Sequence, residues 1–168
     1  WKMHVSPRGV FFTSPQYIFL FSHDDRFIAS WKPSHRFRFS YWLRDRFIVQ
    51  DDQTGLNEVS GDSLIFVAGS EALAGTQIYA ILPHGESAIL LQTRSSGTWL
   101  WEKDQFKKIS WEAGRYLEEQ QVYGGILTSW GQYMFNTLRN GVVLTEQDGR
   151  IVQIYNKQSG LQDNSVYD

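Results

Sequence analysis

The side chains that could carry out acid–base catalysis or bind a metal are scattered along this chain of 168 residues. The four histidines, at positions 4, 23, 35 and 84, show neither the His-x-His nor the HExxH spacing that metal sites use. Two carboxylate pairs, Asp24-Asp25 and Asp51-Asp52, lie in expected hairpin turns, where aspartate is favoured because it hydrogen-bonds the nearby backbone. We therefore expect no catalytic residue, no metal site and no cofactor.

The adjacent glycines Gly124-Gly125 could suggest a phosphate-binding loop. Such a loop joins a strand to a helix, and the sequence around this pair lacks that context. Close packing of neighbouring strands is therefore the better explanation of the two glycines.

Five side chains are candidates for binding a ligand: Trp111, Tyr116, Trp130, Arg94 and Arg139. The three aromatic residues lie in predicted connections, where binding residues tend to occur. The two arginines lie on predicted loops between strands, on the face that the longer connections share. We expect a ligand site, if this chain contains one, on that face.

Composition excludes several classes of partner and site. A net charge of −2 gives no general attraction to nucleic acid or to an anionic membrane. The chain has no cysteine, so it has neither a disulfide framework nor a thiolate metal site. No apolar run approaches the length of a membrane span, and no basic start precedes an apolar signal core. We expect no nucleic-acid partner, no membrane contact by these residues, and a mature or excised segment.

An internal repeat positions the candidate residues. Tyr79, Tyr123 and Tyr167 stand 44 residues apart, each preceded by isoleucine or valine. Further pairs keep the same separation without a gap: Thr93 with Thr137, Gly97 with Gly141 and Asp104 with Asp148. Repeats of this length that consist of short β-rich segments are typical of β-propeller blades, each a four-stranded antiparallel sheet.

The strand pattern extends this repeat along the whole chain. Asn140-Gly141 and Asp148-Gly149 are turn pairs that favour tight hairpins. We predict an all-β fold, a β-propeller segment of about four blades plus the opening strand of a fifth. The predicted blades cover residues 1–32, 35–68, 77–110 and 121–156, and the opening strand covers residues 164–168. The only segment with helical tendency is Trp111–Gln120, where Gly114 weakens the prediction.

Aromatic residues within the predicted strands have two possible roles, because ligand platforms and blade cores use the same side chains. We expect most of the following to pack between neighbouring blades: Phe11, Phe19, Phe39, Phe66, Tyr79, Leu91, Tyr123 and Phe135.

Three segments resemble the two-component regulator propeller repeat. Ser159–Asp168 is similar to its "GLPxNxVY" opening, with Gln162 in place of the usual proline. Ala88–Leu100 and Gln132–Leu144 resemble its "LWIGT…GL" segment, with Thr and Gly at the matching positions. The tryptophan and the first glycine of that segment are replaced by leucine and glutamine in one copy and by methionine and asparagine in the other.

This resemblance implies a context that composition alone does not give. Proteins with these repeats are typically bacterial membrane sensors with a periplasmic or otherwise extracytoplasmic propeller, often followed by a histidine kinase or another output module. The expected function is non-catalytic sensing of a carbohydrate or another small extracellular ligand. The expected further partners are the remaining blades of a parent chain or another copy of this one. The alternatives are a propeller glycosidase or lyase and a protein-interaction platform.

Overall fold

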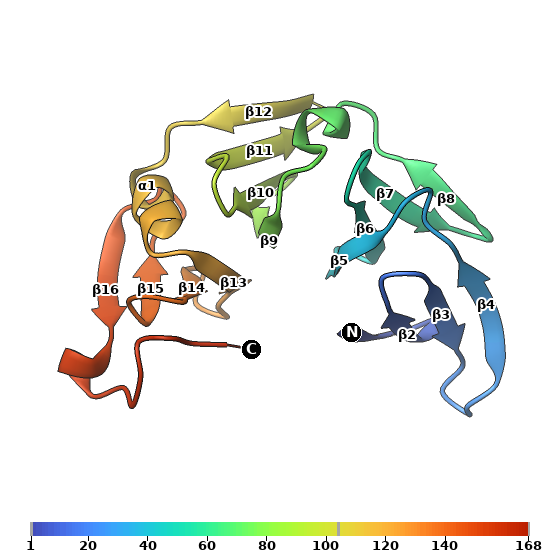
Figure 1. The fold of residues 1–168 in the computed structure, drawn as a ribbon, viewed down its shortest axis with the longest axis horizontal. Helices are drawn as coiled ribbons and strands as arrows, with labels where there is room; N and C mark the ends of the chain where they lie inside the picture. Colours follow the sequence, from blue (N-terminus) through green and yellow to red (C-terminus); the bar gives the residue numbers. More distant parts are fainter. Residues whose placement is uncertain (1, 104, 168) are drawn as a thin grey trace. The chain divides into compact units, whose positions relative to one another are not determined.

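The computed structural model describes residues 2–103 and 105–167, and within them the chain forms four four-stranded antiparallel sheets (Figure 1). In each sheet the strands follow one another in sequence order, as in a propeller blade. The expected all-β propeller fold class is therefore confirmed. Three residues with expected roles lie outside the described residues: Trp1 in the first strand, Asp104 in the repeat and Asp168 at the end of the last expected strand.

The chain divides into two compact units, residues 1–75 and residues 76–168, with two sheets in each. The first sheet of unit 1 consists of β1 (Lys2–Ser6), β2 (Gly9–Thr13), β3 (Ile18–Phe21) and β4 (Phe27–Trp31). The second consists of β5 (Phe37–Leu43), β6 (Arg46–Asp51), β7 (Gly55–Ser60) and β8 (Ser63–Phe66), and the short 3-10 helix η1 (Ser70–Leu73) follows.

The core of unit 1 is built from alternate residues of facing strands. Phe11 is fully buried, and its ring stacks on that of Phe47 with centroids 4.3 Å apart. Phe66, which we expected to pack between blades, is 44% exposed because it ends β8, the last strand of its sheet. That expectation was wrong for this residue.

Unit 2 contains two further sheets and a helix. The first sheet consists of β9 (Ile78–His84), β10 (Ala88–Thr93), β11 (Thr98–Glu102) and β12 (Gln105–Ile109). The helix α1 (Glu112–Glu119) leads to the second sheet, which consists of β13 (Val122–Leu127), β14 (Tyr133–Thr137), β15 (Val142–Thr145) and β16 (Ile151–Tyr155), with the 3-10 helix η2 (Lys157–Ser159) after it. The core of unit 2 contains Trp111, Tyr133 and Phe135.

The helix α1 forms despite Gly114 because that glycine lies against the sheet. A Cβ at position 114 would stand 2.6 Å from the Thr98 hydroxyl oxygen, so the close approach of the helix needs the missing side chain. Ala113 and Leu117 bury the same side of the helix. Tertiary packing therefore outweighs the low helix propensity of glycine here.

The 44-residue repeat produces the same loop conformation in both sheets of unit 2. Thr93 donates its hydroxyl to the Gly97 carbonyl (2.7 Å), and Thr137 does the same to the Gly141 carbonyl (2.9 Å). Both glycines have φ near +80°, at 83° and 75°, a conformation that favours glycine. The matched Thr and Gly thus fix the turn between the second and third strands of each sheet.

The segment expected to open a further blade forms no strand within its described residues, 164–167. It is held instead by the β14–β15 loop: the Gly141 amide donates to the Asn164 carbonyl (2.7 Å), and the Val166 amide donates to the Thr137 carbonyl (3.0 Å). The Asn136 side chain also donates to the Val166 carbonyl (3.0 Å). These bonds place Tyr167 beside the start of the second sheet of unit 2.

Candidate functional site

Three repeated tyrosines form a continuous row in unit 2, which we call the tyrosine row. The ring centroids of Tyr79 and Tyr123 are 5.4 Å apart, and those of Tyr123 and Tyr167 are 5.3 Å apart. Interplanar angles of 35° and 79° give one tilted and one edge-on contact, both common geometries of aromatic pairs. Residues separated by 44 positions in the sequence therefore meet on one surface.

The row follows from the register of the first strands. Tyr79 and Tyr123 are each the second residue of their strand, β9 and β13, and these two strands lie side by side. Side chains alternate along a strand, so the preceding Ile78 and Val122 point into the core and are buried. The tyrosines consequently remain half-buried, and Tyr167 is 64% exposed. Solvent exposure therefore increases along the row from Tyr79 and Tyr123 to Tyr167.

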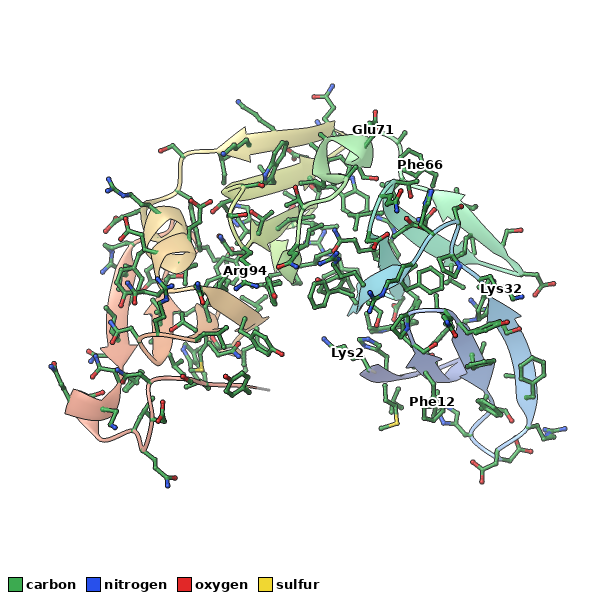
Figure 2. All side chains as sticks on the ribbon, in the orientation of Figure 1. Lys2, Phe12, Lys32, Phe66, Glu71 and Arg94 are labelled. Carbon is green, nitrogen blue, oxygen red and sulfur yellow. The ribbon has the colours of Figure 1, made fainter. Side chains whose placement is uncertain are left out.

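Arg94 supplies a positive charge at one end of the tyrosine row (Figure 2). Its Nη1 donates to the Gln77 Oε1 at 3.3 Å and to the Tyr79 hydroxyl at 3.5 Å. The Tyr79 hydroxyl in turn donates to the same Gln77 oxygen at 3.4 Å. Among the ion pairs of the described residues, none involves Arg94, so no described carboxylate neutralises its charge.

A backbone hydrogen bond fixes the position of Arg94. The Arg94 amide donates to the Gln77 carbonyl at 2.9 Å, which ties the β10–β11 loop to the residue just before β9. The corresponding bond in the second sheet joins the Leu138 amide to the Gln121 carbonyl at 3.0 Å. Leu138 therefore occupies the position equivalent to Arg94, and the repeat provides one arginine at this position rather than two.

Tyr116 and Arg139 belong to a second polar network, at the end of α1. The side-chain amide of Asn140 donates to the Tyr116 hydroxyl, and the side-chain amide of Asn156 donates to the Asn140 side-chain oxygen (2.9 Å). Arg139 donates to the Glu119 carbonyl (3.3 Å) in the last turn of the helix. None of these hydrogen bonds links the network to Arg94 or to the tyrosine row.

Trp111 and Trp130 lie elsewhere. Trp111 is 8% exposed, with its ring 5.8 Å from that of Phe135 and its indole N–H donated to the Gln147 carbonyl, so it is a core residue. Trp130 is 66% exposed, but it lies in the β13–β14 turn, at the opposite end of the sheet from the β14–β15 loop. Of the five sequence candidates, only Arg94 adjoins the tyrosine row.

From the sequence, Gln77 was not expected at a site, Tyr79 and Tyr123 were expected mostly to pack between blades, and Tyr167 was expected only as a repeat position on the opening strand. The signal that could have found the row is the repeat itself. Equivalent positions on adjacent first strands must be neighbours, and aromatic side chains reach across the gap between them.

The acidic pairs of unit 1 have structural roles. The Ser22 hydroxyl donates to Asp24 at 2.6 Å, and Arg26 pairs with the same carboxylate at 2.8 Å; these contacts lower the pKa of Asp24. Asp51 is buried and accepts hydrogen bonds from the backbone amides of His35 and Gln53. Within residues 2–103 and 105–167, no group of three or more His, Asp or Glu side chains could hold a metal ion.

Sequence comparison gives no family for this chain: no protein-family model matches it, and no curated protein does. In the part of the chain that the structure describes, no helix has the length and apolar character needed to span a membrane.

Comparison of structures finds clear similarity. Over 97% of its length the chain matches the extracellular domain of the putative hybrid two component system BT3049 from B. thetaiotaomicron, with a TM-score of 0.74 and 13% identity. The extracellular domain of BT4673 from the same organism matches 89% of the chain with a TM-score of 0.62 and 11% identity. The AfRom2 CNH domain matches 92% of this chain, and the match covers 53% of the AfRom2 chain, with a TM-score of 0.62 and 12% identity.

The chain spans only 23% and 20% of the two B. thetaiotaomicron chains that it matches. At identities this low the similarity establishes the fold, and one fold supports many functions.

Proposed function

We propose that this chain is part of the extracytoplasmic sensor propeller of a bacterial membrane receptor of the two-component type, and that it binds its ligand without chemical conversion. The observation that carries the proposal is the structural match over 97% of the chain to an extracellular domain of a hybrid two-component system. The site supports it, because the tyrosine row with Arg94 offers binding groups but no nucleophile paired with a base.

The proposed ligand is a carbohydrate. Tyrosine rings present flat apolar faces on which the C–H face of a sugar ring can lie, and their hydroxyls can exchange hydrogen bonds with sugar hydroxyls. Arg94 and Gln77 add donors and an acceptor at one end of the row. The three rings of the row, each about 5 Å from the next, give a surface longer than one sugar, so an oligosaccharide fits this row better than a monosaccharide.

A glycan array probed with the purified chain tests this proposal, with affinities of the retained glycans then measured by calorimetry. We expect Tyr167→Ala and Arg94→Gln each to weaken binding by about tenfold or more, which corresponds to the loss of about 1.4 kcal/mol. Tyr155→Ala is the matched control, because Tyr155 is also exposed (42%) but lies on β16, the last strand of its sheet.

Product analysis separates the sensor from its main alternative. The proposed function requires that the bound glycan be recovered intact after prolonged incubation. Cleavage by a propeller glycosidase or lyase would overturn it, as would equal binding by all three variants.

A further inference from the structure

Unit 1 contains a surface cavity of about 690 Å³ that lies far in sequence from the tyrosine row. It is lined by residues from the β2–β3 turn, from β3 and from the connection between β4 and β5: Ser14, Pro15, Gln16, Tyr17, Phe19, His35 and Arg36. The Phe37 amide donates to the Pro15 carbonyl at 2.9 Å and joins these segments. Its volume falls within the range of small-molecule sites, roughly 300–1,000 Å³.

One wall of this cavity is aromatic. The rings of Tyr17 and Phe19 are nearly parallel, with an interplanar angle of 17° and centroids 5.4 Å apart. Side chains at positions i and i+2 lie on the same face of extended chain, which brings these rings together. Both rings are only partly buried, so part of this aromatic wall remains available to a ligand.

Arg36 lines this cavity and Lys32 lines a smaller cavity beside it, so both bring positive charge to the site. Lys32 places its ammonium 5.0 Å from the centre of the Tyr17 ring, in a smaller adjoining cavity that also includes Gln16 and His35. Arg36 is exposed, and neither Arg36 nor Lys32 takes part in an ion pair with another described residue. Among the residues that the structure describes, no carboxylate lines either cavity.

The buried carboxylate of Asp51 holds His35 in place. Its carboxylate is 1% exposed and contacts His35 twice, through the ring Nδ1 at 3.2 Å and the backbone amide at 3.0 Å. Burial alone would raise the pKa of Asp51, but the hydrogen bonds from the amides of His35 and Gln53 outweigh it, so the pKa is lowered and the group is ionised. With Nδ1 engaged, the Nε2 of His35 has no hydrogen-bond partner among the described residues.

We infer that this cavity is a binding site for a small carboxylate with a ring in its body, separate from the tyrosine row. The ring lies against Tyr17 and Phe19, and the carboxylate meets Arg36 and Lys32. A guanidinium can bind a carboxylate through two parallel hydrogen bonds, and the aromatic wall excludes water from one side of the pair. This inference is independent of the proposed carbohydrate site.

Benzoate is a suitable probe, and amide chemical shifts of the ¹⁵N-labelled chain report where it binds. We expect saturable shifts at Tyr17, His35 and Arg36 in the millimolar range that is typical of such small ligands. Benzamide removes the charge, and acetate removes the ring. Each should bind at least about fivefold more weakly, because each lacks one of the two groups that the site contacts.

Two variants and a control complete the test. Arg36→Gln and Lys32→Gln should weaken benzoate binding at least about threefold, whereas Arg8→Gln, an exposed arginine in the β1–β2 turn, should leave it unchanged. The inference would be overturned if the shifts were centred on residues away from this cavity, or if they did not saturate. It would also be overturned if benzamide or acetate bound as tightly as benzoate. Binding of sulfate as tightly as benzoate would also overturn it, since the aromatic wall would then contribute nothing.

Discussion

Gly125 provides a sharp test of how the two sheets of unit 2 pack. It lies on β13 directly opposite Phe135 of β14. A Cβ built at position 125 would stand 2.6 Å from the Phe135 Cδ1 and 3.1 Å from the Cβ of Ala80 on β9. Phe135 is fully buried, and the rings of Trp111 and Tyr133 lie 5.8 and 6.0 Å from its own, so the ring has little room to retreat.

The expected cost of Gly125→Ala follows from two opposed effects. Replacing glycine within a strand by alanine favours folding by about 0.5–1 kcal/mol through the backbone entropy of the unfolded chain. Overpacking of a filled core costs about 1–3 kcal/mol. We expect the second effect to dominate, with a net loss of about 1–2 kcal/mol, whereas alanine at an open strand position would be neutral or stabilising.

A double-mutant cycle identifies the contact responsible. Leucine at position 135 has no ring edge near the new methyl group, so Gly125→Ala should cost less in a Phe135→Leu background than in the wild type, with a coupling of about 1 kcal/mol. Urea unfolding followed by circular dichroism and by tryptophan fluorescence measures each term, provided that the m-value is unchanged. Ser129→Ala, in an exposed turn, is the control. A neutral Gly125→Ala, or strictly additive costs, would refute the packing described above.

Two further predictions concern the cores of the two units. Burial, with a smaller contribution from Lys2, lowers the pKa of His4 to about 4, so the unfolded chain takes up a proton near pH 6.5 and the folded chain does so only near pH 4. The contribution of His4 to the free energy of unfolding should therefore be full above pH 6.5 and decline by on the order of 1–3 kcal/mol as the pH falls to 4. The variant His4→Gln should flatten this part of a profile of urea midpoint against pH. An unchanged profile would contradict the assignment. Leu91→Ala should cost about 2–5 kcal/mol in the same assay, because Leu91 is fully buried on β10, and a cost below about 0.5 kcal/mol would mean that its burial is wrong.

The architecture was predictable because it depends on local signals that repeat. The turn pairs Asn140-Gly141 and Asp148-Gly149 and the alternation of apolar residues mark strands without reference to tertiary contacts. Gly125 was likewise expected to serve close packing of first strands, and Ala80 on the neighbouring β9 is what it approaches.

The candidate sites were less predictable because they depend on packing between elements. Trp111 lies in a connection, and only the docking of α1 shows that it is buried. The positive charge at the cavity in unit 1 comes from an irregular connection outside the repeat, so neither periodicity nor spacing indicated it. The expected association with further blades or with another copy of the chain stays a prediction.

The central claim is that the tyrosine row binds a glycan that is not converted, and ring NMR signals of tyrosine-labelled chain test it most directly. On titration with an oligosaccharide retained on the array, the ring signals of Tyr123 and Tyr167 should shift together and saturate, while that of Tyr155 stays in place. The oligosaccharide's own spectrum should remain that of the intact molecule. Unmoved signals of Tyr123 and Tyr167 at saturation, or the appearance of cleavage products, would contradict the account.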